Sequence, residues 1–112
     1  MNKSDCLFCK IANKEIPSAF LFETDEVVAF KDINPQAPVH ILVVPKKHYD
    51  NLNDADEHTL GKLFVAVKEI AVNAGVSDGY RTVVNTGKKA GQEVEHLHLH
   101  ILAGRPFIWP PG

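Results

Sequence analysis

The chain lacks long hydrophobic runs and a surplus of charge of one sign. None of its apolar stretches approaches the ~20 residues that a transmembrane helix needs, so we expect no membrane span. The formal net charge of −2 argues against a protein that binds a nucleic-acid polymer or an anionic membrane through bulk charge. Any anionic partner therefore has to be bound at a local site, and this favours small ligands.

Cysteine is scarce, and the apolar core of a secretory signal peptide is missing. Residues 1–5 are polar and run directly into Cys6, so we expect a cytoplasmic protein whose thiols stay reduced. Cys6 and Cys9 form a Cys-x-x-Cys pair, which is then a candidate for metal binding or redox chemistry before it is a disulfide. A thioredoxin-like redox pair is disfavoured, because the motif does not follow a predicted strand.

Internal repeats, low-complexity tracts and long linkers are absent as well. With 112 residues, of which 45% are hydrophobic and 23% charged, the chain has the composition of an ordinary globular protein with one core. We expect a single domain over residues 1–112, whose last part, residues 105–112, forms an extended tail.

Turn-forming residues divide the chain into short strands and two helices. A short helix is expected over residues 6–13, capped by Ser4-Asp5, and a longer one over about residues 55–74, capped by Asn53 or Asp54. Strands are expected at residues 20–23, 27–31, 39–44 and 80–85, and from the histidine-rich segment to about residue 102. Strands joined mostly by short loops favour an antiparallel α+β fold over a βαβ array.

The segment His96-Leu97-His98-Leu99-His100 carries three of the six histidines at alternate positions. Alternate side chains of a strand share a face, so we expect the three imidazoles to project together and the leucines to face the core. A solvated face that carries histidines by chance is the simplest alternative, but such faces usually consist of Thr, Lys, Glu or Ser. Two functional interpretations remain open: a metal platform of neutral imidazoles, or a nucleophilic histidine oriented by its neighbours.

The segment His96-Leu97-His98-Leu99-His100-Ile101-Leu102 matches the pattern His-φ-His-φ-His-φ-φ, with φ apolar, which is the signature of the histidine triad family. The resemblance covers nearly the whole chain and includes residues 30–38, 40–48 and 91–92. The ending Trp109-Pro110-Pro111-Gly112 is most similar to the histidine triad nucleotide-binding branch. The resemblance implies a five-stranded antiparallel sheet with two helices, extended across a homodimer.

The resemblance also implies an activity, the hydrolysis of purine nucleoside 5′-monophosphoramidates, including nucleotidyl-lysine conjugates of AMP or GMP. Carried over to this chain, His98 is the nucleophile and forms a nucleotidyl-histidine intermediate, with its other nitrogen held by a backbone carbonyl. His40 and His100 hydrogen-bond each other and the phosphate oxygens. A function of another class, a non-catalytic nucleotide-sensing or interaction module that uses the same pocket, stays open.

The nucleotide pocket that the resemblance implies draws on several segments. Asp32 binds the ribose hydroxyls, and Trp109 approaches the active site of the partner subunit. The phosphate is bound by Asn85 and by the backbone of Gly91, Gln92, Glu93 and Val94. The base is enclosed by Phe8, Ile11, Phe30 and Ile33. From the residues alone, Asp32 is as readily a turn residue, and the four apolar residues are as readily core. Glu93 differs from some family members, which have at this position a serine that helps to protonate the leaving amine.

Cys6-x-x-Cys9 is a weak metal signal alone, since small buried cysteines are common. Zinc-containing members of the family are similar to this chain in a second respect, because they have histidines at the positions of His48 and His96. We therefore hypothesise a structural zinc bound by Cys6, Cys9, His48 and His96, which together complete a tetrahedral shell. A zinc enzyme with the metal on all three triad histidines is disfavoured, because the cysteines and His48 offer a more complete site.

Overall fold

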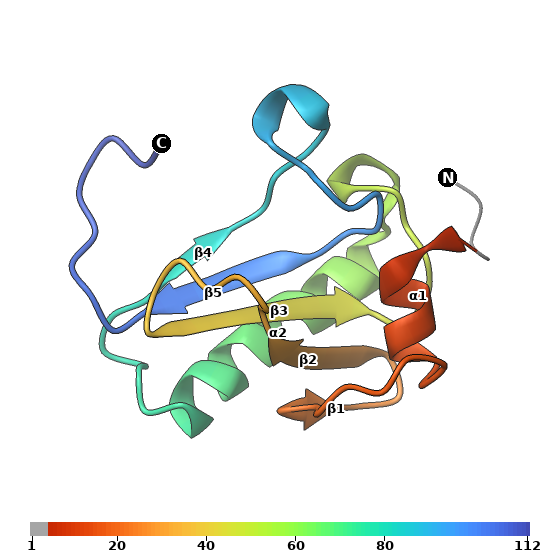
Figure 1. Cartoon of the computed structure of the whole chain (residues 1–112), viewed down its shortest axis with the longest axis horizontal. Helices are drawn as coiled ribbons and strands as arrows, with labels where there is room; N and C mark the ends of the chain where they lie inside the picture. The colour runs from red at the N-terminus through yellow and green to blue at the C-terminus, as the bar shows by residue number, and fades with distance from the viewer. Residues whose placement is uncertain (1–4) are drawn as a thin grey trace.

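The computed structural model, which describes residues 5–112, is a five-stranded antiparallel sheet with two α-helices, and this confirms the predicted α+β fold (Figure 1). Neighbouring strands pair antiparallel throughout. The spatial order is β1-β2-β3-β5-β4, with bounds β1 (Phe22–Glu23), β2 (Val27–Lys31), β3 (Val39–Pro45), β4 (Arg81–Val83) and β5 (Leu99–Ala103). The tail, residues 104–112, contains no helix or strand.

The two helices cover opposite faces of the sheet. α2 (Glu57–Asn73) lies behind the sheet in Figure 1. Its fully buried Leu63 belongs to a core cluster that includes residues of β2, β3 and β5. α1 (Leu7–Ala12) packs on the other face, in a cluster that includes Leu42. Because both of its faces are covered, β3 is an almost continuous apolar run. No helix within residues 5–112 is long and apolar enough to cross a membrane.

The long helix begins later than the sequence predicts. The predicted caps were Asn53 and Asp54, but α2 starts at Glu57 and its N-cap is Asp56, whose side chain accepts from the Thr59 amide at 2.8 Å. Asn53 and Asp54 instead belong to a separate 3₁₀ turn, Leu52–Asp54, where Asp54 accepts from backbone amides ahead of the turn. Several Asx side chains in succession compete as caps, and the pattern alone does not separate them.

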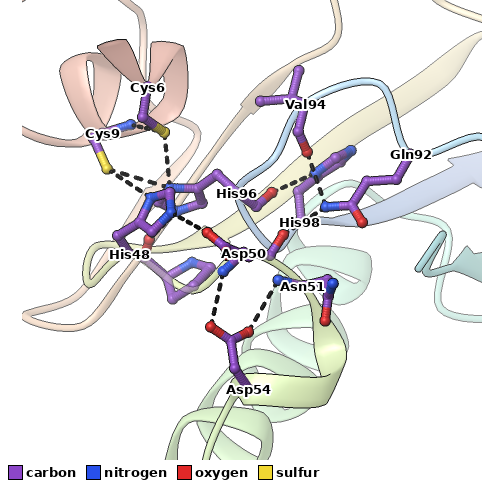
Figure 2. Close-up of polar contacts among 11 residues, drawn as sticks. Cys6, Cys9, His48, Asp50, Asn51, Asp54, Gln92, Val94, His96 and His98 are labelled. Atoms are coloured by element: carbon purple, nitrogen blue, oxygen red, sulfur yellow. Dashed lines mark hydrogen bonds and ion pairs between the residues drawn. The ribbon is translucent and has the colours of Figure 1, made fainter. Parts of the chain in front are cut away.

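The short helix also has a different cap. The N-cap is Cys6, whose thiol accepts from the Cys9 amide at 3.3 Å, so the predicted cap Asp5 is wrong, and Ser4 lies outside the described residues. The two cysteines of the motif are therefore on one helical turn, with both thiols on the side that faces the sheet (Figure 2).

The histidine-rich segment is only partly a strand. β5 begins at Leu99, opposite Val43, so His96 and His98 precede the ladder. The physical reason is that the Leu97 amide donates to the Tyr49 carbonyl at 2.7 Å instead of to β3. The predicted alternation survives this change, since Leu97 and Leu99 are fully buried in the cluster beneath α2.

Two strands are shorter than predicted because both lie at sheet edges. β1 begins at Phe22 rather than at residue 20, and β4 covers residues 81–83 rather than 80–85. The partner of β4 limits it, because Val83 already pairs with His100, near the beginning of β5.

Candidate active site

His40 and His100 lie on adjacent strands, on the sheet face opposite α2. In the β3–β5 ladder His40 is opposite Leu102 and His100 is opposite Leu42, so both imidazoles project from the same face. The ring centroid of His98 is 5.1 Å from that of His100 and 5.1 Å from that of Phe8 on α1. The three histidines therefore form one row that starts beside α1 and continues over the open part of the face.

His98 is held in one tautomer by the protein backbone. Its Nδ1 donates to the His96 carbonyl oxygen over 2.8 Å, and because a carbonyl oxygen can only accept, Nδ1 carries the proton. In the neutral ring the lone pair is then on Nε2. Burial lowers the pKa of His98, while the hydrogen bond to His96 and the carboxylates of Asp32 and Glu93 act in the opposite direction. The neutral, nucleophilic form therefore predominates at physiological pH.

A second chain of hydrogen bonds fixes the other two rings. The Gln36 amide donates to His40 Nδ1 at 3.0 Å, so the proton of neutral His40 is on Nε2, which donates to His100 Nδ1 at 2.9 Å. The N–H of neutral His100 is consequently on Nε2, and that nitrogen is available as a donor. Burial, followed by the proximity of His98 and His40, lowers the pKa of His100 to about 4, so this ring is neutral near pH 7.

Asp32 has two roles in the structure. Its Oδ1 accepts from the Asn34 amide at 2.8 Å, which is the turn role that the sequence left open. Its Oδ2 lies 3.4 Å from His40 Nε2, so the carboxylate also adjoins the histidine row. Asp32, His40 and His100 form a group that could hold a metal, but the ordered hydrogen bonds already use both nitrogens of His40 and Nδ1 of His100.

The predicted apolar pocket residues fall into two kinds. Phe8 and Phe30 are each 5% exposed and meet edge to face at 5.7 Å, so they are core residues that form a wall beside His98. Ile11 is partly buried and packs against the same cluster. Ile33 is 100% exposed and Trp109 is 83% exposed, so neither is core, and the chain alone does not enclose a base with them.

The loop between β4 and β5 is organised by the side chain of Gln92. Its Oε1 accepts from the Gly87 amide at 2.8 Å, and its Nε2 donates to the carbonyls of Asp50 at 2.6 Å and Val94 at 3.0 Å. Gly87 and Gly91 have φ angles of 85° and 88°, which favour glycine and allow the turn. The predicted phosphate-binding segment is therefore a loop that these hydrogen bonds hold in place. Both Oε1 and Nε2 of the Gln92 side chain are engaged in hydrogen bonds.

Cys6, Cys9, His48 and His96 converge at the end of the sheet beside α1 (Figure 2). The ligand atoms all lie within 4.8 Å of one another. Three contacts between sulfur and Nδ1 define the group: Cys6 to His96 at 3.3 Å, Cys9 to His48 at 3.2 Å and Cys9 to His96 at 3.4 Å. Such separations are close to the edges of a tetrahedron with Zn–S and Zn–N bonds of about 2.3 and 2.0 Å. The four residues can hold a metal.

The surroundings of this cluster also fit a metal. His96 Nε2 contacts the Pro45 carbonyl at 2.9 Å, and His48 Nε2 contacts Asp50 Oδ1 at 2.8 Å. Because these acceptors keep the proton on Nε2, both rings present the lone pair of Nδ1 to the cysteines, as metal-bound histidines do. Burial lowers the pKa of His96 to about 4, which favours the neutral ring that a metal requires.

Three contributors were missed from the sequence. The Gln36 amide, which donates to His40, and the Pro45 carbonyl, which contacts His96, are backbone groups. Their residue types therefore do not indicate these roles. Asp50 links His48 through its side chain and Gln92 through its carbonyl. Its position two residues after His48 was the one available signal.

The fold and the site define an α+β protein with a histidine-based site on the open face of its sheet. Residues 13–107 match the family model of the HIT domain, so the chain belongs to the HIT family. It is 52% identical over 111 residues to an uncharacterized HIT-like protein of Synechocystis, an alignment that covers 96% of this chain and 97% of the relative.

Solved structures give the same assignment. A HIT family hydrolase from Legionella pneumophila superimposes with a TM-score of 0.92 at 47% identity, covering 96% of this chain and all of that one (100%). A histidine triad nucleotide-binding protein from Candida albicans superimposes with a TM-score of 0.85 at 33% identity, covering 95% and 83%. The chain is thus a HIT-family protein with the fold of HIT family hydrolases.

Proposed function

We propose that the protein hydrolyses purine nucleoside 5′-monophosphoramidates by nucleophilic attack of His98 on the α-phosphorus. The observation that carries the proposal is the hydrogen bond from His98 Nδ1 to the His96 carbonyl, which leaves the lone pair on Nε2. An imidazole that is neutral and held in one tautomer is a competent nucleophile at physiological pH. The similarity to a HIT family hydrolase and to a nucleotide-binding relative supports this choice.

The reaction has two displacements. In the first, His98 Nε2 forms a bond to phosphorus while the bond to the amine nitrogen breaks, and the amine leaves with a proton taken from solvent. In the second, water attacks the same phosphorus and gives up a proton to solvent, the bond from phosphorus to His98 Nε2 breaks, and the nucleotide is released with His98 neutral again. Among residues 5–112 no hydrogen bond engages His100 Nε2, so its N–H can donate to a phosphate oxygen while charge builds up there.

The remaining substrate contacts in this proposal use residues around the histidine row. Asp32 adjoins His40 and supplies a carboxylate for two ribose hydroxyls. Asn85 lines the groove beside His100, and in the loop tied by Gln92 the backbone amides of Glu93 and Val94 are the proposed donors to the phosphate. The amides of Gly91 and Gln92 already donate to the carbonyls of Lys88 and Gly87. Phe8 and Phe30, with Ile11 and Ile33, provide the apolar side for the base.

We further propose that Cys6, Cys9, His48 and His96 hold a structural zinc. Four protein ligands would complete the shell and leave no open position for a water, so the metal supplies stability rather than chemistry. The fit of the donor atoms and of their hydrogen-bonded rings supports this assignment.

A homodimer completes the proposal. α2 exposes apolar side chains on its outer surface, with Phe64 45%, Val65 54% and Val72 64% exposed. β4 is an edge strand, so one of its sides is unpaired in the sheet. The large apolar side chain of Trp109 is exposed rather than packed in the core. Burial of these surfaces against a second copy would extend the sheet, and it would bring the tail of one subunit toward the site of the other.

The test follows AMP release from adenosine 5′-monophosphoramidate by the wild type and by His98→Ala, with folding checked by circular dichroism. Release that is abolished in folded His98→Ala supports the nucleophilic hydrolase. If neither protein releases AMP although both bind it, the chain is instead a nucleotide-sensing or interaction module that uses the same pocket.

A further inference from the structure

The short segment of residues 48–50, which follows β3, contacts several parts of the molecule at once. His48 belongs to the cysteine–histidine cluster, where its Nδ1 is 3.2 Å from Cys9 Sγ. The Tyr49 carbonyl accepts from the Leu97 amide at 2.7 Å, and Leu97 lies between two of the triad histidines. The segment therefore joins the cluster to the histidine-rich segment.

Asp50 uses its two acceptor groups in different directions. Its side-chain Oδ1 accepts from His48 Nε2 at 2.8 Å, whereas its carbonyl oxygen accepts from Gln92 Nε2 at 2.6 Å. The side chain of Gln92 also binds the Gly87 amide and the Val94 carbonyl, near the two ends of the loop of residues 86–94. A continuous chain of polar contacts thus leads from the cluster through Asp50 to this loop (Figure 2).

The turn that carries Asp50 is closed by its own hydrogen bonds. Asp54 accepts from the Asp50 and Asn51 amides at 3.1 Å each, and the Asn51 side chain accepts from the Asn53 amide at 2.8 Å. The ring of His48 is also confined, because its side chain is only 7% exposed. A hydrogen-bonded turn between a buried ring and a loop can transmit a displacement from one to the other.

A second contact between a histidine and a carboxylate lacks these properties. His58 Nε2 is 2.7 Å from Glu26 Oε1, but the side chain of His58 is 63% exposed. Within residues 5–112, neither residue belongs to a group that could hold a metal. Distance alone therefore does not distinguish Asp50. The distinguishing feature is its place between a buried residue of the cluster and Gln92.

We propose that Asp50 is a positioning residue that couples the cysteine–histidine cluster to the loop of residues 86–94, so that a metal bound at the cluster orders this loop. A metal on Nδ1 of His48 would restrain the ring that Asp50 holds at Nε2. The proposal rests on the proposed function, because it makes the structural zinc a regulator of the loop assigned to the phosphate. Such coupling is reciprocal, so the loop must affect the zinc affinity by the same factor.

The first experiment measures zinc affinity by competition with a chromogenic chelator. Gln92→Leu should weaken zinc binding about fivefold or more, although Gln92 is not a ligand. Asp50→Ala should also weaken it, and Gln92→Leu should cause no further loss in that background, because the connection is already interrupted. Asp50→Asn keeps a side-chain oxygen for His48, so in its background Gln92→Leu should again weaken binding as it does in wild type.

Three controls separate this coupling from other effects. Glu26→Ala removes the other contact between a histidine and a carboxylate, and Lys89→Ala changes an exposed side chain in the same loop; both should keep the wild-type zinc affinity. Leu63→Ala destabilises the core beneath α2. If it weakens zinc binding as much as Gln92→Leu does, the effect is global unfolding and the proposal is overturned. It is also overturned if Gln92→Leu binds zinc like wild type, or if wild type binds none.

Hydrogen exchange follows the same coupling from the loop. Removal of zinc by a chelator should increase exchange in residues 86–94 of wild type and of Asp50→Asn, whereas exchange of this loop in Asp50→Ala should not depend on zinc. Equal responses of wild type and Asp50→Ala overturn the proposal. If exchange rises throughout the chain, the affinity comparison with Leu63→Ala decides.

Neither measurement uses hydrolysis, so the two proposals can fail separately. If no phosphoramidate is hydrolysed while zinc affinity and loop exchange respond as expected, the proposed function fails and the coupling through Asp50 stands. If phosphoramidates are hydrolysed but Gln92→Leu leaves zinc affinity unchanged, the coupling fails and the proposed function stands.

Discussion

His98 donates from Nδ1 to the carbonyl oxygen of His96, 2.8 Å away, and His96 is at the same time a member of the Cys6–Cys9 cluster. The backbone of His96 thus orients His98, the proposed nucleophile, while the His96 side chain contacts both thiols. Any change that moves the His96 main chain shifts the cluster and the attacking nitrogen together.

The cluster gives the first prediction. We expect freshly purified protein to contain about one zinc per chain by metal analysis, and Cys9→Ser to lose it and to unfold at a markedly lower temperature, because metal binding contributes directly to folding. AMP release by folded Cys9→Ser should fall at most about tenfold, since zinc does no chemistry in the proposed mechanism. Less than a trace of zinc in unchelated wild type would contradict the assignment.

Gln92 gives the second prediction. Its amide makes three hydrogen bonds to the backbone of separate segments, so Gln92→Leu leaves those groups without their partner. We expect kcat/KM for a phosphoramidate to fall by about 10–100-fold, because the loop between β4 and β5, which we propose binds the phosphate, loses its geometry. Hydrogen exchange should rise selectively in residues 86–94. Lys89→Ala, an exposed change in the same loop, is the control and should leave both quantities near wild type. Unchanged exchange in Gln92→Leu would argue against a positioning role.

The third prediction concerns pH. Burial lowers the pKa of His100 to about 4 in the folded protein, against about 6.5 in the unfolded chain. Between these values the unfolded state binds more protons, so the stability contribution is complete above about pH 6.5 and is lost as the pH falls toward 4. The urea midpoint of wild type should therefore decrease over this range more steeply than that of His100→Asn. Parallel curves for the two proteins would show that His100 does not titrate in this way.

The fourth prediction concerns assembly. Phe64→Asp places a charge on the exposed apolar surface of α2 and should yield monomers in light scattering, whereas we expect wild type to be dimeric. Leu21→Asp is a matched control, because Leu21 is also 45% exposed but lies before β1, away from α2. Leu63→Ala, next to Phe64 in sequence but fully buried, should instead cost about 2–5 kcal/mol of unfolding free energy. A monomeric wild type at micromolar concentration would rule the dimer out.

Much of the fold could be predicted because the relevant signals are local. The alternation from Leu97 to Ile101 assigned the buried side of the histidine segment correctly, although only part of that segment is strand. The prediction for the cap of α2 was wrong, since Asn53, Asp54 and Asp56 lie close together and are comparable caps in isolation. The choice of Asp56 depends on Asn51 and Asp54 closing their own turn first.

The candidate site also contains residues that the sequence predicts and others that it does not. The histidines and cysteines stand out by residue type, and the resemblance to a known family grouped them. The resemblance led us to expect a backbone carbonyl at His98, and the structure identifies it as that of His96. The roles of Gln36 and Asp50 could not be recognised, because Gln36 acts through its main-chain amide and Asp50 partly through its carbonyl. The contact of Arg81 and Arg105 with Phe107, away from the histidine row, was also not predicted, because the two arginines are far apart in sequence.

The hydrogen-bond chain that starts at the Gln36 amide has a consequence for protein engineering. Every residue except proline has this N–H, so side-chain changes at position 36 leave the first link of the chain in place. The same holds for the carbonyl that orients His98. A designer can therefore change the side chains that line the proposed nucleotide pocket while the hydrogen bonds that orient His40 and His98 stay in place.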